Sequence, residues 1–273
     1  MSLTLTSRKY YINSERRLEG TSSSFTYEII IPPQEKYDHV CVLQASIPLS
    51  YYLVEDGEYI TLREGATDAN IFIPAGNYSA SSFVTIVKPL INAASPNGWV
   101  YNMTIPNSFL SPSTGLFTWT VTGHTSQPAF IFDDTDLHRP FGFSQNTTNT
   151  FVSGSLTSTN VVLFIPETTV FIHSDIANNG QNDMLQEIYS DNTVPFSNIV
   201  YKCTSVEGYS KKLTTRDNNV FKFNLTDKHG HTLNFHGQDV LITLILYRKD
   251  DLMMQFLRYI QTQANYNSQQ LEE

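Results

Sequence analysis

The chain has 273 residues, of which 16% are charged and 12% are aromatic, with 17 Phe and 15 Tyr. A chain of this length can form one large β domain or two smaller units, each with a sizeable core. The formal net charge of -9 argues against genome packaging by the whole molecule, because its field would repel a phosphate backbone. The two cysteines, Cys41 and Cys203, stand far apart in the sequence and exclude a disulfide scaffold.

Residues 1–24 are polar and contain a basic cluster formed by Arg8, Lys9, Arg16 and Arg17. We predict a flexible amino-terminal arm here. Two interpretations stay open: a solvated terminus, or an arm that docks on a neighbouring subunit or reaches toward nucleic acid. The segment lacks an apolar stretch, so we expect no signal peptide and no secretion by that route.

Strands follow the arm. Residues 25–31 alternate and then turn apolar, and Pro32-Pro33 ends this strand because proline cannot donate to a β-ladder. The long β-rich stretch 39–54 contains Pro48, which predicts either two collinear strands or one strand bent at an edge of the sheet.

Residues 56–145 differ in character and predict a small α+β unit of their own. Segments 59–64 and 70–74 predict a hairpin, and apolar residues at helical spacing after a serine cap predict a helix over 79–95, kinked or restarted at Lys88-Pro89. Strands are expected at 99–105, 116–121 and 129–132, followed by a brief helix within 134–143.

A linker rich in Ser, Thr and Asn spans 145–160 and marks the predicted domain boundary. Beyond it, strands are expected at 161–176, 198–206, 220–227, 231–237 and 240–247. Short strands separated by turn residues predict an antiparallel sandwich or jelly roll built from 25–55 and 146–250. The apolar run 240–247 is too short to cross a bilayer, so we expect no membrane insertion.

Residues 251–273 form an amphipathic segment and a polar tail. The apolar stripe consists of Leu252, Met253, Phe256, Leu257 and Ile260. The stripe either caps the core or docks on a partner, and the sequence leaves both options open.

Catalytic motifs are missing from the sequence: we find no Walker A loop, no GxGxxG, no HExxH and no GxSxG elbow. We therefore expect a protein that is not an enzyme, with no catalytic, cofactor-binding or metal-binding residues. No small-molecule substrate and no cofactor are implied, and the residues of any subunit interface stay unknown at this stage.

Three histidines, His229, His231 and His236, form the best metal candidate, since imidazole suits zinc or copper and residues two apart on a strand share a face. The alternative is that Asp227 to Gly230 form a hairpin turn, which would separate the rings. We favour the turn.

An aspartate cluster and two tyrosine pairs also have both a functional and a structural interpretation. The carboxylates Asp133, Asp134 and Asp136 invite a calcium site or a general acid pair, but an acidic helix amino-terminus explains them better. The pairs Tyr10-Tyr11 and Tyr51-Tyr52 would suit stacking on sugars or bases, whereas cross-strand packing or subunit contact is their more ordinary role.

Several phrases of the sequence resemble the penton, or vertex minor capsid, proteins of the virophage and Polinton-like lineage of double-stranded DNA viruses. They are RKYYINSERRLEGTSSSFTYEIIIP and HVCVLQASIPLSYYLV near the start, IPAGNYSASSFVTIVKPLIN and PFGFS in the middle, and VFKFNLTDKHGHTLNFHGQDVLITLILYR near the end. The resemblance covers most of the chain in order, and it is one of phrases rather than of a catalytic signature.

The resemblance implies a single jelly roll interrupted by an inserted domain, and a homopentamer at the fivefold vertices of an icosahedral virion. It also implies a double jelly-roll major capsid protein as partner and assembly inside the host cell. A carbohydrate- or host-receptor-binding β module of a virion surface is the alternative function, and an enzyme is the least favoured class.

Overall fold

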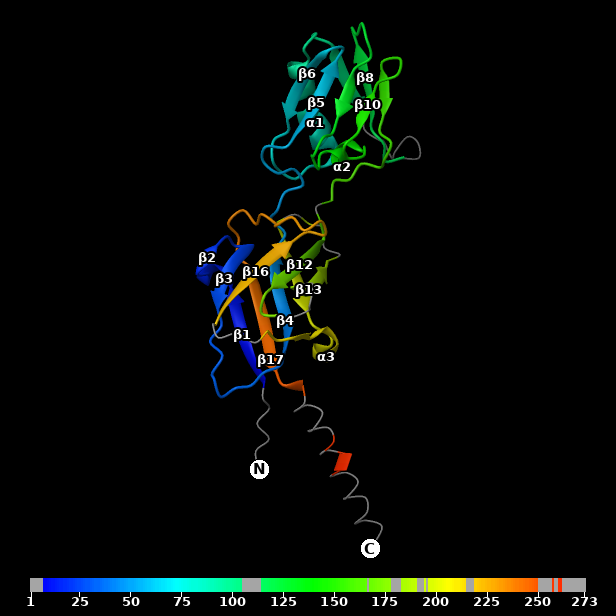
Figure 1. Cartoon of the computed structure of the whole chain (residues 1–273). Helices are drawn as coiled ribbons and strands as arrows, with labels where there is room; N and C mark the ends of the chain where they lie inside the picture. Colours follow the sequence, from blue (N-terminus) through cyan, green and yellow to red (C-terminus); the bar gives the residue numbers. More distant parts are fainter. Residues whose placement is uncertain are drawn as a thin grey trace, which may run out of the picture. The chain divides into compact units, whose positions relative to one another are not determined.

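The computed structural model describes residues 7–104, 114–165, 167–177, 183–190, 194, 196–214, 219–249, 257 and 260–261. The chain divides into two compact units (Figure 1). Unit 1 comprises Met1–Tyr51 and Glu167–Glu273, and unit 2 comprises Tyr52–Pro166. Unit 2 thus lies, in sequence, between the two segments of unit 1.

Unit 1 contains two antiparallel sheets. Sheet A has the strand order β1-β17-β4-β14, with the short β15 also paired to β4, and sheet B has the order β13-β12-β16-β3-β2. The elements of unit 1 are β1 (Ser7–Asn13), η1 (Ser14–Arg16), β2 (Glu19–Gly20), β3 (Ser24–Glu28), β4 (His39–Pro48), β12 (Thr169–Ser174), β13 (Met184–Tyr189), β14 (Asn198–Lys202), α3 (Val206–Tyr209), β15 (Lys211–Lys212), β16 (Val220–Thr226) and β17 (Leu241–Tyr247).

The core of unit 1 lies between these two sheets, because alternate residues of each strand face inward. On β17 the inward residues are Ile242, Leu244 and Leu246, all almost fully buried. Phe25 of β3 and Phe223 of β16 stack at 5.5 Å between ring centroids. The predicted mainly β, sandwich-like architecture is confirmed at this level.

The prediction of a flexible arm over residues 1–24 is wrong for residues 7–24; residues 1–6 lie outside the described part. Strand β1 pairs with β17 from Ser7 to Asn13 without a break in register. Its Ile12 is 2% exposed and belongs to the core. The strand was not predicted because β1 contains charged residues. Such residues are typical of an edge strand and not of a central one.

Unit 2 contains two smaller antiparallel sheets and a helix. One sheet has the order β10-β9-β5-β6 and the other β11-β8-β7. The elements of unit 2 are β5 (Tyr59–Glu64), β6 (Thr67–Phe72), α1 (Ala80–Ala94), β7 (Val100–Thr104), β8 (Thr118–Thr122), β9 (Ala129–Ile131), α2 (His138–Phe141), β10 (Thr148–Thr150) and β11 (Ser155–Thr157).

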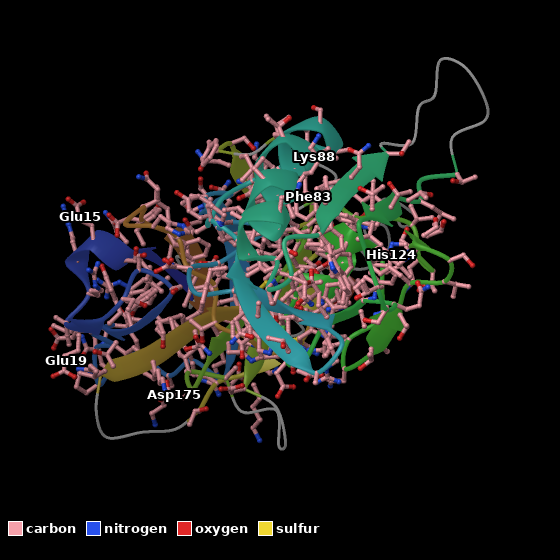
Figure 2. All side chains as sticks on the ribbon, turned by 90° about the horizontal axis from the view of Figure 1, so that it is seen from above. Glu15, Glu19, Phe83, Lys88, His124 and Asp175 are labelled. Carbon is pink, nitrogen blue, oxygen red and sulfur yellow. The ribbon has the colours of Figure 1, made fainter. Side chains whose placement is uncertain are left out.

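Aromatic side chains dominate the core of unit 2. Phe83, labelled on α1 in Figure 2, lies 5.0 Å from Phe141 and 5.6 Å from Tyr78, measured between ring centroids. Trp119 stacks on Phe141, with the ring centroids 5.5 Å apart. Such ring pairs add to the stabilisation that burial alone gives.

The expected hairpin is confirmed, since β5 and β6 pair from Tyr59 to Glu64. Helix α1 begins after Ser79, whose hydroxyl forms a capping box with Ser82. The helix continues through Pro89 as one element, so of the two predicted alternatives, a kink or a restart, the restart is wrong. Pro89 cannot donate to the carbonyl one turn back, but the buried apolar stripe holds the helix against its sheets.

Several predicted elements differ from the structure. The unit expected over 56–145 extends further, because β10 pairs with β9 and β11 pairs with β8. Of the strand expected over 161–176 only β12 forms; the main-chain N–H of Val162 instead donates to Gly115. Residues 231–237 form no strand beyond a single bridge between Thr226 and Thr232.

The carboxy-terminal stripe lies outside the described residues except for the exposed Leu257 and Ile260.

Candidate interface surfaces

The three candidate histidines are not brought together. His229 and His231 lie at the turn after β16, with ring centroids 6.1 Å apart, and His231 pairs with Asp227 at 3.4 Å. The Nδ1 atom of His236 lies 2.9 Å from the carbonyl of Ser50. Among the residues described, no group of three or more His, Cys, Asp and Glu side chains could hold a metal ion.

The acidic cluster serves the chain around α2. The carboxylate of Asp136 pairs with the Arg139 guanidinium at 3.4 Å. The main-chain carbonyl of Asp136 also accepts a hydrogen bond from the main-chain N–H of Arg139. Asp134 has a positive φ of 49°, and its N–H donates to the side chain of Asn146 at 3.0 Å. These contacts fix a turn, and the first turn of α2 itself carries no acidic residue.

The tyrosine pairs have separate roles. Tyr51 is 3% exposed, packs 6.2 Å from Phe235 and donates its hydroxyl to the carbonyl of Glu167. Tyr10 packs against the core, whereas Tyr11 on the same strand is 73% exposed. Tyr11 is therefore available for contact with a partner, and Tyr51 is not.

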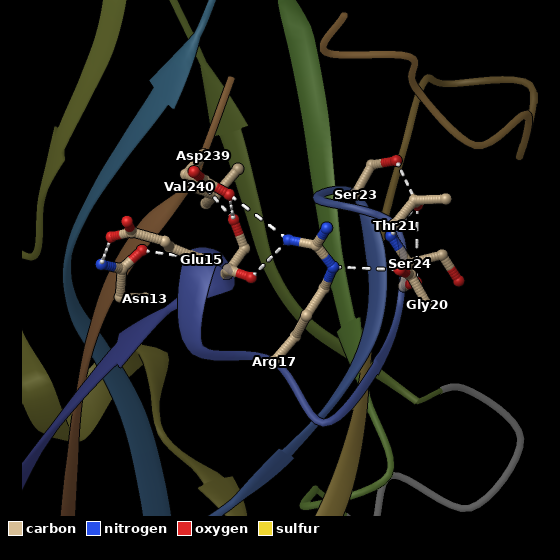
Figure 3. Close-up of polar contacts among 10 residues, drawn as sticks. Asn13, Glu15, Arg17, Gly20, Thr21, Ser23, Ser24, Asp239 and Val240 are labelled. Atoms are coloured by element: carbon tan, nitrogen blue, oxygen red, sulfur yellow. Dashed lines mark hydrogen bonds and ion pairs between the residues drawn. The ribbon is translucent and has the colours of Figure 1, made fainter. Parts of the chain in front are cut away.

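The basic cluster of the amino terminus is largely held within the molecule. Arg17 donates to the carbonyls of Ser14 (2.8 Å) and Gly20 (2.9 Å), and its Nη1 atom lies 3.6 Å from Asp239. Figure 3 shows Arg17 between Gly20 and Asp239. The buried hydroxyl of Ser14 donates to Asp239 (2.8 Å) and accepts from the N–H of Val240 (2.9 Å). Arg17 thus fastens the turn after β1 to the start of β17.

Arg8 is also paired within unit 1, with its Nη1 3.2 Å from Glu35 and its guanidinium 5.7 Å from the Tyr10 ring centroid. The other two basic residues, Lys9 and Arg16, are exposed. The cluster is therefore not a free basic arm.

Two buried polar groups have structural explanations. Glu64 is 1% exposed and accepts hydrogen bonds from Ser95, the N–H of Asn97 and the hydroxyl of Tyr101, at 2.7 to 2.8 Å. A carboxylate satisfied in this way stabilises unit 2.

In unit 1, the sulfur atoms of Cys41 and Cys203 lie 3.7 Å apart, and burial raises the pKa of the Cys41 thiol to about 12.

The outer face of sheet A has two cross-strand rows. One runs Asn13, Leu241, Ser46, Val200 and the other Tyr11, Thr243, Gln44, Lys202, in the order β1-β17-β4-β14. Three of their apolar side chains are unusually exposed: Tyr11 by 73%, Val200 by 66% and Leu241 by 52%. Exposed apolar side chains gathered on one face are typical of a contact surface.

The outer face of sheet B presents a different set. Phe171 of β12 lies between Glu187 of β13 and Thr226 of β16, and the neighbouring row pairs Tyr189 with Thr169. Tyr189 is 74% exposed. Neither face could be predicted from the sequence, because each row joins strands that are distant in the chain and is defined only by the strand register.

No helix in the described part of the chain is long and apolar enough to span a membrane. No family model matches the chain, and no curated protein matches it in sequence. Among solved structures, it is similar to the mavirus penton protein, known from a crystal structure of the selenomethionine-labelled form. The TM-score is 0.43 at 13% identity, over 88% of this chain and 99% of that chain. This likeness is weak and concerns the fold alone.

Proposed function

We propose that the chain is a structural capsid protein without enzymatic activity: a penton that forms homopentamers at the fivefold vertices of an icosahedral virion. Its partner there would be a double jelly-roll major capsid protein. The observation that carries the proposal is the strand order of unit 1.

Numbered in chain order, the eight longer strands of unit 1 form one sheet with the order 1-8-3-6 and another with the order 5-4-7-2. Such an order is expected of a single jelly roll, in which successive strands alternate between two sheets except for the fourth and fifth, which pair within one sheet. Unit 2 enters between the third and fourth of these strands. A jelly roll interrupted by a separate domain is what the resemblance to pentons implies, and this strand order supports the proposal.

Such a role needs no active site. A jelly roll buries the inner faces of both sheets and leaves outer faces, edges and loops for neighbours, and identical copies in heterologous contact close into a ring. The exposed apolar residues on the outer faces, Tyr11, Val200, Leu241 and Tyr189, fit such contacts.

The mass of the purified full chain, measured by light scattering during size-exclusion chromatography, tests the proposal. We expect a mass near five times 30.9 kDa. Co-expression with a double jelly-roll major capsid protein is the second measurement, with fivefold vertices imaged by electron microscopy. A chain that stays monomeric and is also absent from such particles would overturn the proposed function.

A further inference from the structure

The strands of the two sheets carry opposite charge. Among Lys, Arg, Asp and Glu, the strands of sheet A contain only basic residues. These are Arg8, Lys9, Lys202, Lys211 and Lys212. Those of sheet B contain three acidic residues, Glu19, Glu28 and Glu187, against one lysine, Lys222. Against a net charge of -9 for the whole chain, the absence of acidic residues from every described strand of sheet A is a marked asymmetry.

The basic residues that matter lie on the outer face of sheet A. Ile12 and Ile199 point into the core, so Lys9 on β1 and Lys202 on β14 point outward by alternation. Both are exposed. Two acidic residues near this sheet already have partners: Glu35 pairs with Arg8 at 3.2 Å and Glu207 with Lys249 at 3.7 Å.

The acidic residues lie on the outer face of sheet B. Glu187 stands opposite Phe171, and Glu19 stands opposite Thr26, both at outward positions of their ladders. Two further carboxylates adjoin this face: Asp175 accepts from the N–H of Lys222 at 2.8 Å, and Asp183 pairs with His173 at 3.0 Å. Figure 2 shows Glu19 and Asp175 at the margin of unit 1.

We infer that the outer face of sheet A docks on the outer face of sheet B in a second copy of the same chain. The two faces lie on opposite sides of one sandwich, so every copy offers a basic face to one neighbour and an acidic face to the other. Contact between two A faces would instead bring Lys9 and Lys202 of both copies together, and like charges in contact are repulsive. A heterologous contact of this kind closes into a ring where the rotation between neighbouring copies divides a full turn evenly, as the proposed pentamer requires.

Apolar side chains suit the same contact. Tyr11, Val200 and Leu241 on sheet A, and Tyr189 on sheet B, offer exposed apolar surface beside the charged residues. Burial of such groups supplies affinity, and the charges select the partner face and its orientation. The inference rests on the proposed function for the existence of a ring, and it adds the two faces that form it.

Charge reversal on the full chain tests this contact. Variant A carries Lys9→Glu and Lys202→Glu, and variant B carries Glu19→Lys and Glu187→Lys; all four side chains are exposed on strands and should not affect folding. We expect the mass of each variant to fall from five copies to one in light scattering. In a mixture of variants A and B every contact between unlike variants is complementary, so at most four of the five contacts in a ring are restored. One chain with all four changes restores them at every contact and should recover the full mass.

Lys88→Glu on α1 of unit 2 is the matched control and should leave the mass unchanged. Thermal unfolding measured by circular dichroism verifies that each variant is folded. The oligomer should also weaken as the salt concentration rises, because charge attraction is screened.

If the wild type is pentameric and variants A and B stay pentameric like the control, the inference is overturned while the proposed function stands. If the purified wild type is monomeric at every concentration, this contact between copies is overturned, and incorporation into capsids decides the proposed function separately.

Discussion

Asp38 shows how a single half-buried carboxylate can link the ends of two strands. Its Oδ1 atom lies 2.8 Å from Nδ1 of His39 and accepts from the main-chain N–H of Lys249 at 2.9 Å. Partial burial acts to raise the pKa of Asp38, but these hydrogen bonds outweigh it and hold the pKa below its ordinary value. The carboxylate therefore fastens the start of β4 to the residues that follow β17.

This shift predicts a pH dependence of stability. Because the folded-state pKa is below the unfolded value of about 4, the stabilisation is present above that pH and is lost as pH falls through the folded-state pKa. Asp38→Asn should lower the melting temperature at neutral pH and reduce its further drop between about pH 5 and about pH 3. Thermal unfolding followed by circular dichroism across this range measures both effects.

Asp56→Asn is the control for this prediction, since Asp56 is exposed in a turn of unit 2. It should reproduce the wild-type pH profile. An Asp38→Asn profile parallel to that of the wild type would show that the carboxylate contributes nothing to acid sensitivity.

At the scale of elements, patterns that depend on local sequence could be predicted and those that depend on distant partners could not. The β5–β6 hairpin and β17 followed from alternation and apolar content alone. Residues 161–165 have the same apolar character, yet Val162 and Phe164 pack against the core of unit 2 without joining a ladder. Hydrophobicity predicts burial, but a strand also needs an edge with which to pair.

The candidate site shows the same limit. The sequence suggested separate roles for the histidines and the aspartates, and their local turn chemistry explains both groups. The outer face of sheet A combines residues such as Tyr11 and Val200, which are almost 190 positions apart in the chain. Only the pairing of β1, β17, β4 and β14 places them on one face.

Strand β1 yields a prediction at this scale. Removal of residues 1–20 should destabilise unit 1, since it deletes the edge strand, Ile12 and the buried Ser14. Ile12→Ala alone should lower the free energy of unfolding by about 3 kcal/mol, the usual cost of a cavity in a core. Denaturant unfolding measures this loss.

Tyr11→Ala is the matched change on the opposite face of β1 and should cost under about 1 kcal/mol in a monomeric state, because that side chain is exposed. If residues 1–20 could be removed without loss of stability, the pairing of β1 with β17 would contribute nothing to the stability of unit 1.

For the whole molecule, the division into two units makes a prediction about independence. Each unit has a hydrophobic core of its own. The hydroxyl of Tyr51 donates to the carbonyl of Glu167, so the two ends of unit 1 meet where unit 2 enters. A short flexible linker can therefore replace residues 53–165, since closing a small gap costs little chain entropy.

We expect the chain with this replacement to fold as a sandwich and to unfold in one cooperative transition, while calorimetry of the full chain should resolve two. If sheets A and B form the ring, the shortened chain should also keep a mass of five copies, because both outer faces remain. A folded but monomeric product would place essential ring contacts in unit 2, and an unfolded product would show that the sandwich of unit 1 depends on unit 2.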